Sequence, residues 1–175
     1  MDFTLAYIPG LLQIADYSRA LFAAVAVRRS EAELAAEVAV RMIRQERLTA
    51  VENPLELVAI VDESVLHRPV GGPAVLRAQL EHVAAAAALD SVSVQVLPNS
   101  VGAHPAMAST FTVLSFGDLG EPDMAYVEHS LGALVLDKEA EVARGRLTFD
   151  RLRSAALGPA ESLAVIRRAA EQEQE

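Results

Sequence analysis

A nearly unbroken apolar run constrains the fold more than any other feature of this sequence. The run, LELVAIV (Leu55–Val61), is typical of a central strand that is covered on both faces. A polar loop follows it, and Pro73 then stands where the first turn of a helix tolerates proline. The inner face of that predicted helix consists of Leu76, Leu80, Val83 and Ala87. A second strand is predicted over Ser91–Pro98, where apolar and polar residues alternate, so these segments form a strand–helix–strand unit.

Further elements are predicted on both sides of this unit. Helical spacing indicates a helix over Leu11–Val27, a second one capped by Ser30, a third over Lys138–Leu157 with Gly145 as a weak point, and a last short one after Gly158-Pro159. Strands are predicted over Ser109–Phe116, Met124–Glu128 and Ala133–Leu136. The acidic tail, residues 171–175, is expected to fray.

These elements predict one α+β domain over residues 1–175, with N-terminal helices, a mixed β-sheet that contains the strand–helix–strand unit, and C-terminal helices. At 175 residues and 52% apolar content the chain can bury a core without disulfides. It has no cysteine, which excludes thiol catalysis and Cys-ligated metals and fits a reducing, cytoplasmic compartment. The longest uncharged apolar run, Val83–Leu89, is too short to span a bilayer, and no signal peptide is recognisable.

Several short stretches of the sequence are more specific than the periodicity of helices and strands requires. They include IPGLLQ, RQERL, VDESVLHRPVGGP, SVSVQVLP, GAHPAM, STFTVLSF and FDRLRSAALGP. Their order and spacing resemble the C-terminal domain of actinobacterial XRE-type helix-turn-helix regulators, the Scr-type antitoxin-like family. The resemblance runs from about Tyr7 to Ile166, nearly the whole chain.

The resemblance implies a role in transcription regulation, in some members within natural-product loci and beside a small partner protein. In that family the DNA-binding module precedes this domain, and the PGLLQ phrase lies well inside the protein. We expect that module to be absent here, because only Met1–Ala6 stand before the matched segment. The formal net charge of −9 also opposes direct contact of this chain with DNA. No catalytic motif is implied.

The loop DESVLHRPVGGP is a first candidate site. It follows the apolar strand and precedes a helix, where unpaired N–H groups favour anions. Arg68 would supply a guanidinium fork, and Gly71 and Gly72 would let backbone amides approach an anionic small molecule or a partner's carboxylate. Alternatively, Gly-Gly-Pro is only a turn and Arg68 pairs with Asp62 or Glu63.

A second candidate gathers Glu63, His104, Tyr126 and Glu128 at strand ends and in the GAHPAM loop. If the strands pair as expected, these residues converge on one crevice, which would serve as a ligand site or, in an enzyme, as an acid–base set. The alternative is that each has a structural partner, such as an arginine of the long C-terminal helix for Glu128. The four histidines show no metal-ligand spacing, so we expect no metal and no cofactor.

The N-terminal segment is rich in large apolar side chains, and one helix is not expected to bury them all on one side. We therefore predict a homodimer through Leu11, Leu12, Tyr17 and Phe22, with full burial against the sheet as the alternative.

The sequence thus favours a non-catalytic sensor or partner-binding module of an antitoxin-like transcriptional regulator. The alternative is a stand-alone enzyme of small-molecule metabolism that uses Glu63, His104, Glu128 and Tyr126 as acid–base groups.

Overall fold

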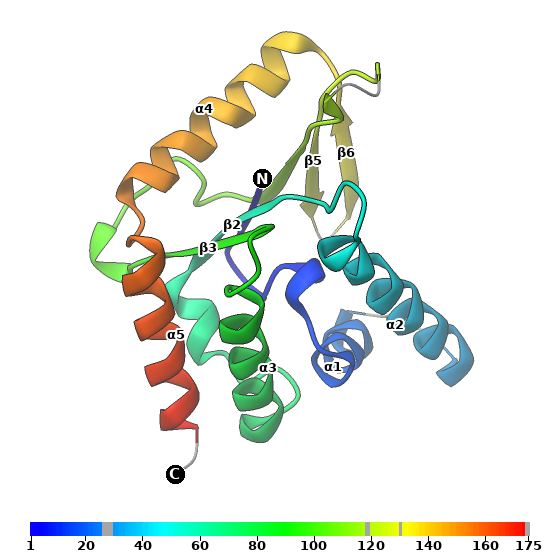
Figure 1. The fold of residues 1–175 in the computed structure, drawn as a ribbon, viewed down its shortest axis with the longest axis vertical. Helices are drawn as coiled ribbons and strands as arrows, with labels where there is room; N and C mark the ends of the chain where they lie inside the picture. Colours follow the sequence, from blue (N-terminus) through cyan, green and yellow to red (C-terminus); the bar gives the residue numbers. More distant parts are fainter. Residues whose placement is uncertain (26–29, 118–119, 130, 174–175) are drawn as a thin grey trace.

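The protein folds around a six-stranded mixed sheet with the strand order β3-β2-β1-β4-β5-β6 (Figure 1). The computed structural model describes residues 1–25, 30–117, 120–129 and 131–173. Helices pack on both faces of the sheet and form two apolar cores, one with α3 (Pro73–Ala86) and α5 (Pro159–Gln172), the other with α4 (Glu139–Ala155). The predicted α+β class is confirmed.

The strand–helix–strand unit is present as predicted. β2 (Leu57–Asp62) and β3 (Val92–Leu97) are parallel neighbours over their whole lengths, and α3 connects them after the short 3₁₀ helix η3 (Glu63–His67). All of β2 except its Val58 and Asp62 positions is buried, because β2 lies between two strands and under helices on both faces. The apolar run therefore has the central place that its composition indicates.

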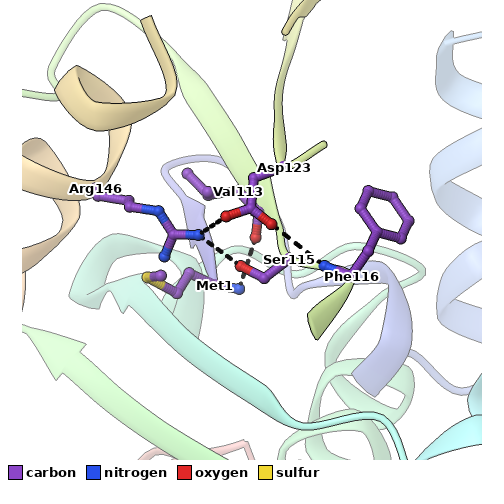
Figure 2. Close-up of polar contacts among 6 residues, drawn as sticks. All are labelled: Met1, Val113, Ser115, Phe116, Asp123 and Arg146. Carbon is purple, nitrogen blue, oxygen red and sulfur yellow. Dashed lines mark hydrogen bonds and ion pairs between the residues drawn. The ribbon is translucent and has the colours of Figure 1, made fainter. Parts of the chain in front are cut away.

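The central strand β1 (Asp2–Thr4) was not predicted. It pairs parallel with β2 and antiparallel with β4 (Thr110–Leu114), so it joins the parallel and antiparallel halves of the sheet. The backbone nitrogen of Met1 also donates to the Val113 carbonyl at 3.0 Å, which extends this pairing (Figure 2). Three residues are too few for a periodic pattern, and only the tertiary pairing reveals them as a strand.

The antiparallel half consists of β4, β5 (Met124–His129) and β6 (Gly132–Leu136), all close to their predicted positions. Helix α4 covers one face of this half with Val142, Phe149 and Leu152. A Cβ on Gly145 would lie 3.2 Å from a methyl of Val113, so this glycine lets α4 approach the sheet closely.

An arginine on α4 links the end of β4 to the start of β5. The Arg146 guanidinium pairs with the Asp123 carboxylate and donates to the Ser115 hydroxyl, while Asp123 also accepts from the Phe116 backbone nitrogen (Figure 2). Glu128, for which an arginine of this helix was considered as a partner, accepts a hydrogen bond from the Tyr7 hydroxyl instead.

The N-terminal helix is shorter than predicted. A 3₁₀ turn, η1 (Gly10–Leu12), comes first, and α1 (Ala15–Val25) begins three residues after it; the predicted end at Val27 lies outside the described residues. Helix α2 (Glu31–Gln45) begins at the predicted Ser30 cap, whose hydroxyl accepts from the Glu33 backbone nitrogen, and the 3₁₀ helix η2 (Glu46–Thr49) continues it.

Two of the four predicted dimer residues belong to the core. Leu12 and Tyr17 are both 0% exposed, and the Tyr17 hydroxyl accepts from the Ile8 backbone nitrogen at 3.2 Å. The break between η1 and α1 turns the two side chains into the same interior, which one continuous helix would not do. The prediction that they form a subunit contact is wrong, whereas Leu11 and Phe22 remain partly exposed.

The C-terminal helix α5 is longer than expected and continues through Glu171 and Gln172, the first residues of the predicted frayed tail. Residues 174–175 of that tail lie outside the described residues. Among the helices of the described residues, none has both the length and the apolar character needed to cross a membrane.

Candidate functional site

A cavity of about 110 Å³ lies where the helical cover of one sheet face ends. On this face α3 and α5 cover the parallel strands, but Leu114 and Val135 of the antiparallel half are exposed. The cavity lies between these two regions, against the segment that carries Tyr7 and against α2. Its lining residues are Asp2, Thr4, Tyr7, Gly10, Arg41, Thr110, Phe111, Thr112, Tyr126 and Glu128.

The strand register builds a polar floor for the cavity. Asp2 on β1 is opposite Thr112 on β4, which is opposite Tyr126 on β5. Two residues along β4, Thr110 is opposite Glu128. Since side chains alternate across a sheet, all of these residues lie on the same face as Thr4, and the apolar Phe3 and Phe111 lie on the other.

The Asp2 carboxyl group is the most perturbed acid of the floor. Its Oδ1 accepts a hydrogen bond from the Thr112 hydroxyl at 3.0 Å. Burial raises the pKa of Asp2 to about 6, and the nearby negative charge of Glu128 acts in the same direction, while the Thr112 hydrogen bond opposes the shift. Asp2 therefore changes its charge close to neutral pH.

Thr4 carries a polar atom that the protein leaves unsatisfied. The residue is 1% exposed, and its hydroxyl has no hydrogen-bond partner among the described residues. Buried hydroxyl groups are ordinarily paired, because an unpaired one costs roughly 1–3 kcal/mol. The unpaired Thr4 hydroxyl in the lining of a cavity is therefore the strongest sign that something else binds there.

The opposite wall carries a phenol and a guanidinium group. The Tyr7 hydroxyl donates to Glu128 Oε2 at 3.0 Å, and burial together with the adjacent Glu128 raises the pKa of Tyr7, so the phenol stays protonated. The Arg41 guanidinium stacks on the Phe22 ring, 4.3 Å from its centroid, and donates to Gln13 Oε1 at 2.6 Å. These contacts hold Arg41 in place. Burial lowers the pKa of its guanidinium group, and the nearby carboxylates of Glu128 and Glu37 act in the opposite direction.

Three glutamines fix the irregular segment that forms this wall. Gln79 of α3 donates to the Leu12 carbonyl at 2.6 Å and accepts from the Ile14 backbone nitrogen at 2.8 Å. Gln45 of α2 donates to the carbonyls of Gly10 and Gln13, and Gln13 itself donates to the Ile8 carbonyl. Side-chain amides thus replace the backbone pairing that this stretch lacks, which preorganises the cavity.

The four residues that were expected in one crevice are divided among three places. Tyr126 and Glu128 line the cavity, as their position on one strand of the sheet suggested. Glu63 instead accepts from the Asn99 backbone nitrogen at 2.7 Å, beyond the ends of β2 and β3. His104 packs edge-on against Phe3, 5.7 Å between ring centroids, on the opposite face of the sheet.

The loop with Arg68 does not form the predicted anion cradle. The Gly72 amide already donates to the Pro69 carbonyl at 2.9 Å. A Cβ on Gly71 would lie 2.9 Å from Val75, so close packing and a positive φ account for this glycine. Arg68 is exposed and makes no ion pair with Asp62, which caps η3 instead.

The sequence analysis missed Asp2, Thr4, Tyr7 and Arg41 as site residues. The available signal was the polar alternation around Phe3 and around Phe111, two short stretches whose polar residues share one face once paired. Within the described part of the chain, no group of three or more His, Cys, Asp or Glu residues could hold a metal ion.

Comparison with known proteins gives a family but no activity. The sequence matches the domain of unknown function DUF5753 over residues 1–168. No curated protein and no solved structure matches the chain. The match covers nearly all of the chain, including every residue that lines the cavity. The protein therefore belongs to the DUF5753 family.

Proposed function

We propose that this domain is the small-molecule sensor of an antitoxin-like transcriptional regulator and that the cavity above β1, β4 and β5 is its binding site. The observation that carries the proposal is the buried, unpaired Thr4 hydroxyl in a cavity lined by ionisable groups. A site whose polar groups are incompletely paired gains hydrogen bonds when a ligand binds, which is the requirement for selective recognition.

The link to a regulator rests on the resemblance to the C-terminal domain of XRE-type helix-turn-helix proteins. In those proteins the DNA-binding module comes before this domain, and β1 is the first element of the chain that we describe. Asp2 and Thr4 of β1 line the cavity, so a bound ligand would contact the first strand of the domain directly. Such a regulator works in the cytoplasm, which fits a chain without cysteine.

The acidic charge assigns DNA contact to another part of such a regulator. With a formal net charge of −9, this domain would be repelled by the phosphates of DNA, and its binding would be electrostatically unfavourable. We therefore expect the domain alone to bind no operator, and its contribution to be a ligand-dependent change in a partner module.

The sensor proposal is tested by screening a metabolite library for compounds that raise the melting temperature. A genuine hit must lose its effect in Glu128→Gln and keep it in Glu81→Gln, a matched control that removes the same charge from the exposed surface of α3. A library without hits, or hits that are indifferent to Glu128, would refute the proposal.

A second candidate function is catalysis, which is favoured by one observation. The pKa of Asp2 lies at about 6, near the value that suits a general acid or base at neutral pH. The acid–base set would then be Asp2, Tyr126 and Glu128, because Glu63 and His104 lie elsewhere. Conversion of a library hit, followed by mass spectrometry, distinguishes an enzyme from a sensor.

A further inference from the structure

We infer that the cavity binds a small protonated amine, whose ammonium group lies between the carboxylates of Asp2 and Glu128 and donates a hydrogen bond to the Thr4 hydroxyl. This inference rests on the proposed function, since it names the ligand class of the same cavity. Three properties of the cavity support it: its charge, its free acceptors and its size.

The charged groups of the lining sum to a negative charge. Asp2 and Glu128 supply two carboxylates, and Arg41 supplies the one cation among the lining residues. Arg41 donates to Gln13 and stacks on Phe22, and its charge also interacts with that of Glu128, so this one cation offsets only part of the negative charge. A ligand with one positive charge balances the charges of the lining, whereas an anion would be repelled by two carboxylates.

Three oxygens of the lining are available as hydrogen-bond acceptors. Oδ1 of Asp2 accepts from Thr112 and Oε2 of Glu128 accepts from Tyr7, which leaves the second oxygen of each carboxylate without a protein partner among the described residues. The Thr4 hydroxyl can also accept. An ammonium group has three N–H donors and no acceptor, so its hydrogen-bonding capacity matches these three atoms.

The size of the cavity selects short ligands and disfavours a metal. Its volume of about 110 Å³ corresponds to roughly three or four water molecules, at about 30 Å³ each in the liquid. That is enough for an ammonium group with a short carbon chain. A divalent metal would require more ligating groups than two carboxylates, and the described residues add no histidine or third acid here.

The inference is tested by calorimetric titration of the wild-type chain with ethylammonium chloride, ethanol, sodium acetate and sodium chloride at pH 8. We expect saturable binding of ethylammonium alone. Asp2→Asn and Glu128→Gln should each weaken it roughly ten- to a hundredfold, the range for a hydrogen bond to a charged group, and Glu81→Gln should not change it. Circular dichroism verifies that each variant is folded.

The pH dependence supplies an independent readout. Asp2 must be ionised to hold the ammonium group. The other ionisable groups of the lining are Tyr7, Arg41, Tyr126 and Glu128, and the Met1 amino group next to Asp2 also acts on its charge. Because the pKa of Asp2 is about 6, affinity should fall about tenfold from pH 8 to pH 5, and binding at pH 6 should release protons to the buffer.

The outcomes separate the two proposals. Equal binding of ethanol or sodium ions, or binding indifferent to both Asp2→Asn and Glu128→Gln, would overturn the amine inference. If acetate or a neutral library compound binds with loss in Glu128→Gln, the ligand class is wrong and the sensor proposal stands. If neither the amine nor any library compound binds, both proposals are refuted.

Discussion

Replacing Gln79 by methionine should destabilise the domain strongly, because this side chain satisfies two backbone groups of the segment around η1. Gln79 is 0% exposed, donates to the Leu12 carbonyl at 2.6 Å and accepts from the Ile14 nitrogen at 2.8 Å. Methionine fills nearly the same space but offers neither hydrogen bond. The Leu12 carbonyl then stays buried and unpaired at a cost of about 1–3 kcal/mol, and the less buried Ile14 N–H adds about 1 kcal/mol.

The expected total is a loss of about 2–4 kcal/mol in the free energy of unfolding, with little change in the denaturant slope, measured by urea titration. The corresponding fall in melting temperature is about 5–15 °C for a domain of this size. Gln172→Met, at the exposed end of α5, is the matched control and should stay within about 0.5 kcal/mol of wild type. A loss below 1 kcal/mol for Gln79→Met would refute the reasoning, since it would mean that water or a rearranged backbone satisfies both groups.

Three further predictions concern other parts of the molecule. Asp2→Asn should stabilise the ligand-free domain above pH 6. The pKa of Asp2 is about 6 in the folded state and near 3.9 in the unfolded state, so the wild type loses up to about 3 kcal/mol of unfolding free energy as pH rises through this interval. Urea titrations from pH 4 to pH 8 measure the difference. Leu12→Glu should abolish the helical circular dichroism signal, because the charge would be buried; a folded monomer would contradict this. Arg146→Ala should lower the free energy of unfolding by about 1 kcal/mol, and a double-mutant cycle with Asp123→Ala should give a non-zero coupling energy. Purely additive effects would show that the two side chains do not interact.

Sequence reasoning locates the parallel half of the sheet because its signals are local and long. The apolar run of β2, the proline that opens α3 and the alternation in β3 each exclude other structures. The same reasoning misses β1, because Asp2–Thr4 is too short for any periodic test. The prediction about Leu12 and Tyr17 is wrong for a related reason: a turn between η1 and α1 changes which side chains share a face.

The candidate site depends on pairing that no local pattern encodes. Tyr126 and Glu128 were identifiable because they alternate on one strand. Asp2 joins them only through the register of β1 with β4, and Arg41 only through the packing of α2 against the segment before it. Glu63 and His104 looked equivalent in the sequence, but the sheet separates them from Glu128.

The threonine methyl groups give the most direct measurement of where a ligand binds. The chain has five threonines: Thr4, Thr110 and Thr112 line the cavity, whereas Thr49 ends η2 and Thr148 lies on α4. In methyl-labelled protein titrated with ethylammonium chloride, the account predicts saturable shifts of the first three resonances and none of the other two. Shifts at Thr49 or Thr148, with Thr4 and Thr112 unmoved, would contradict it.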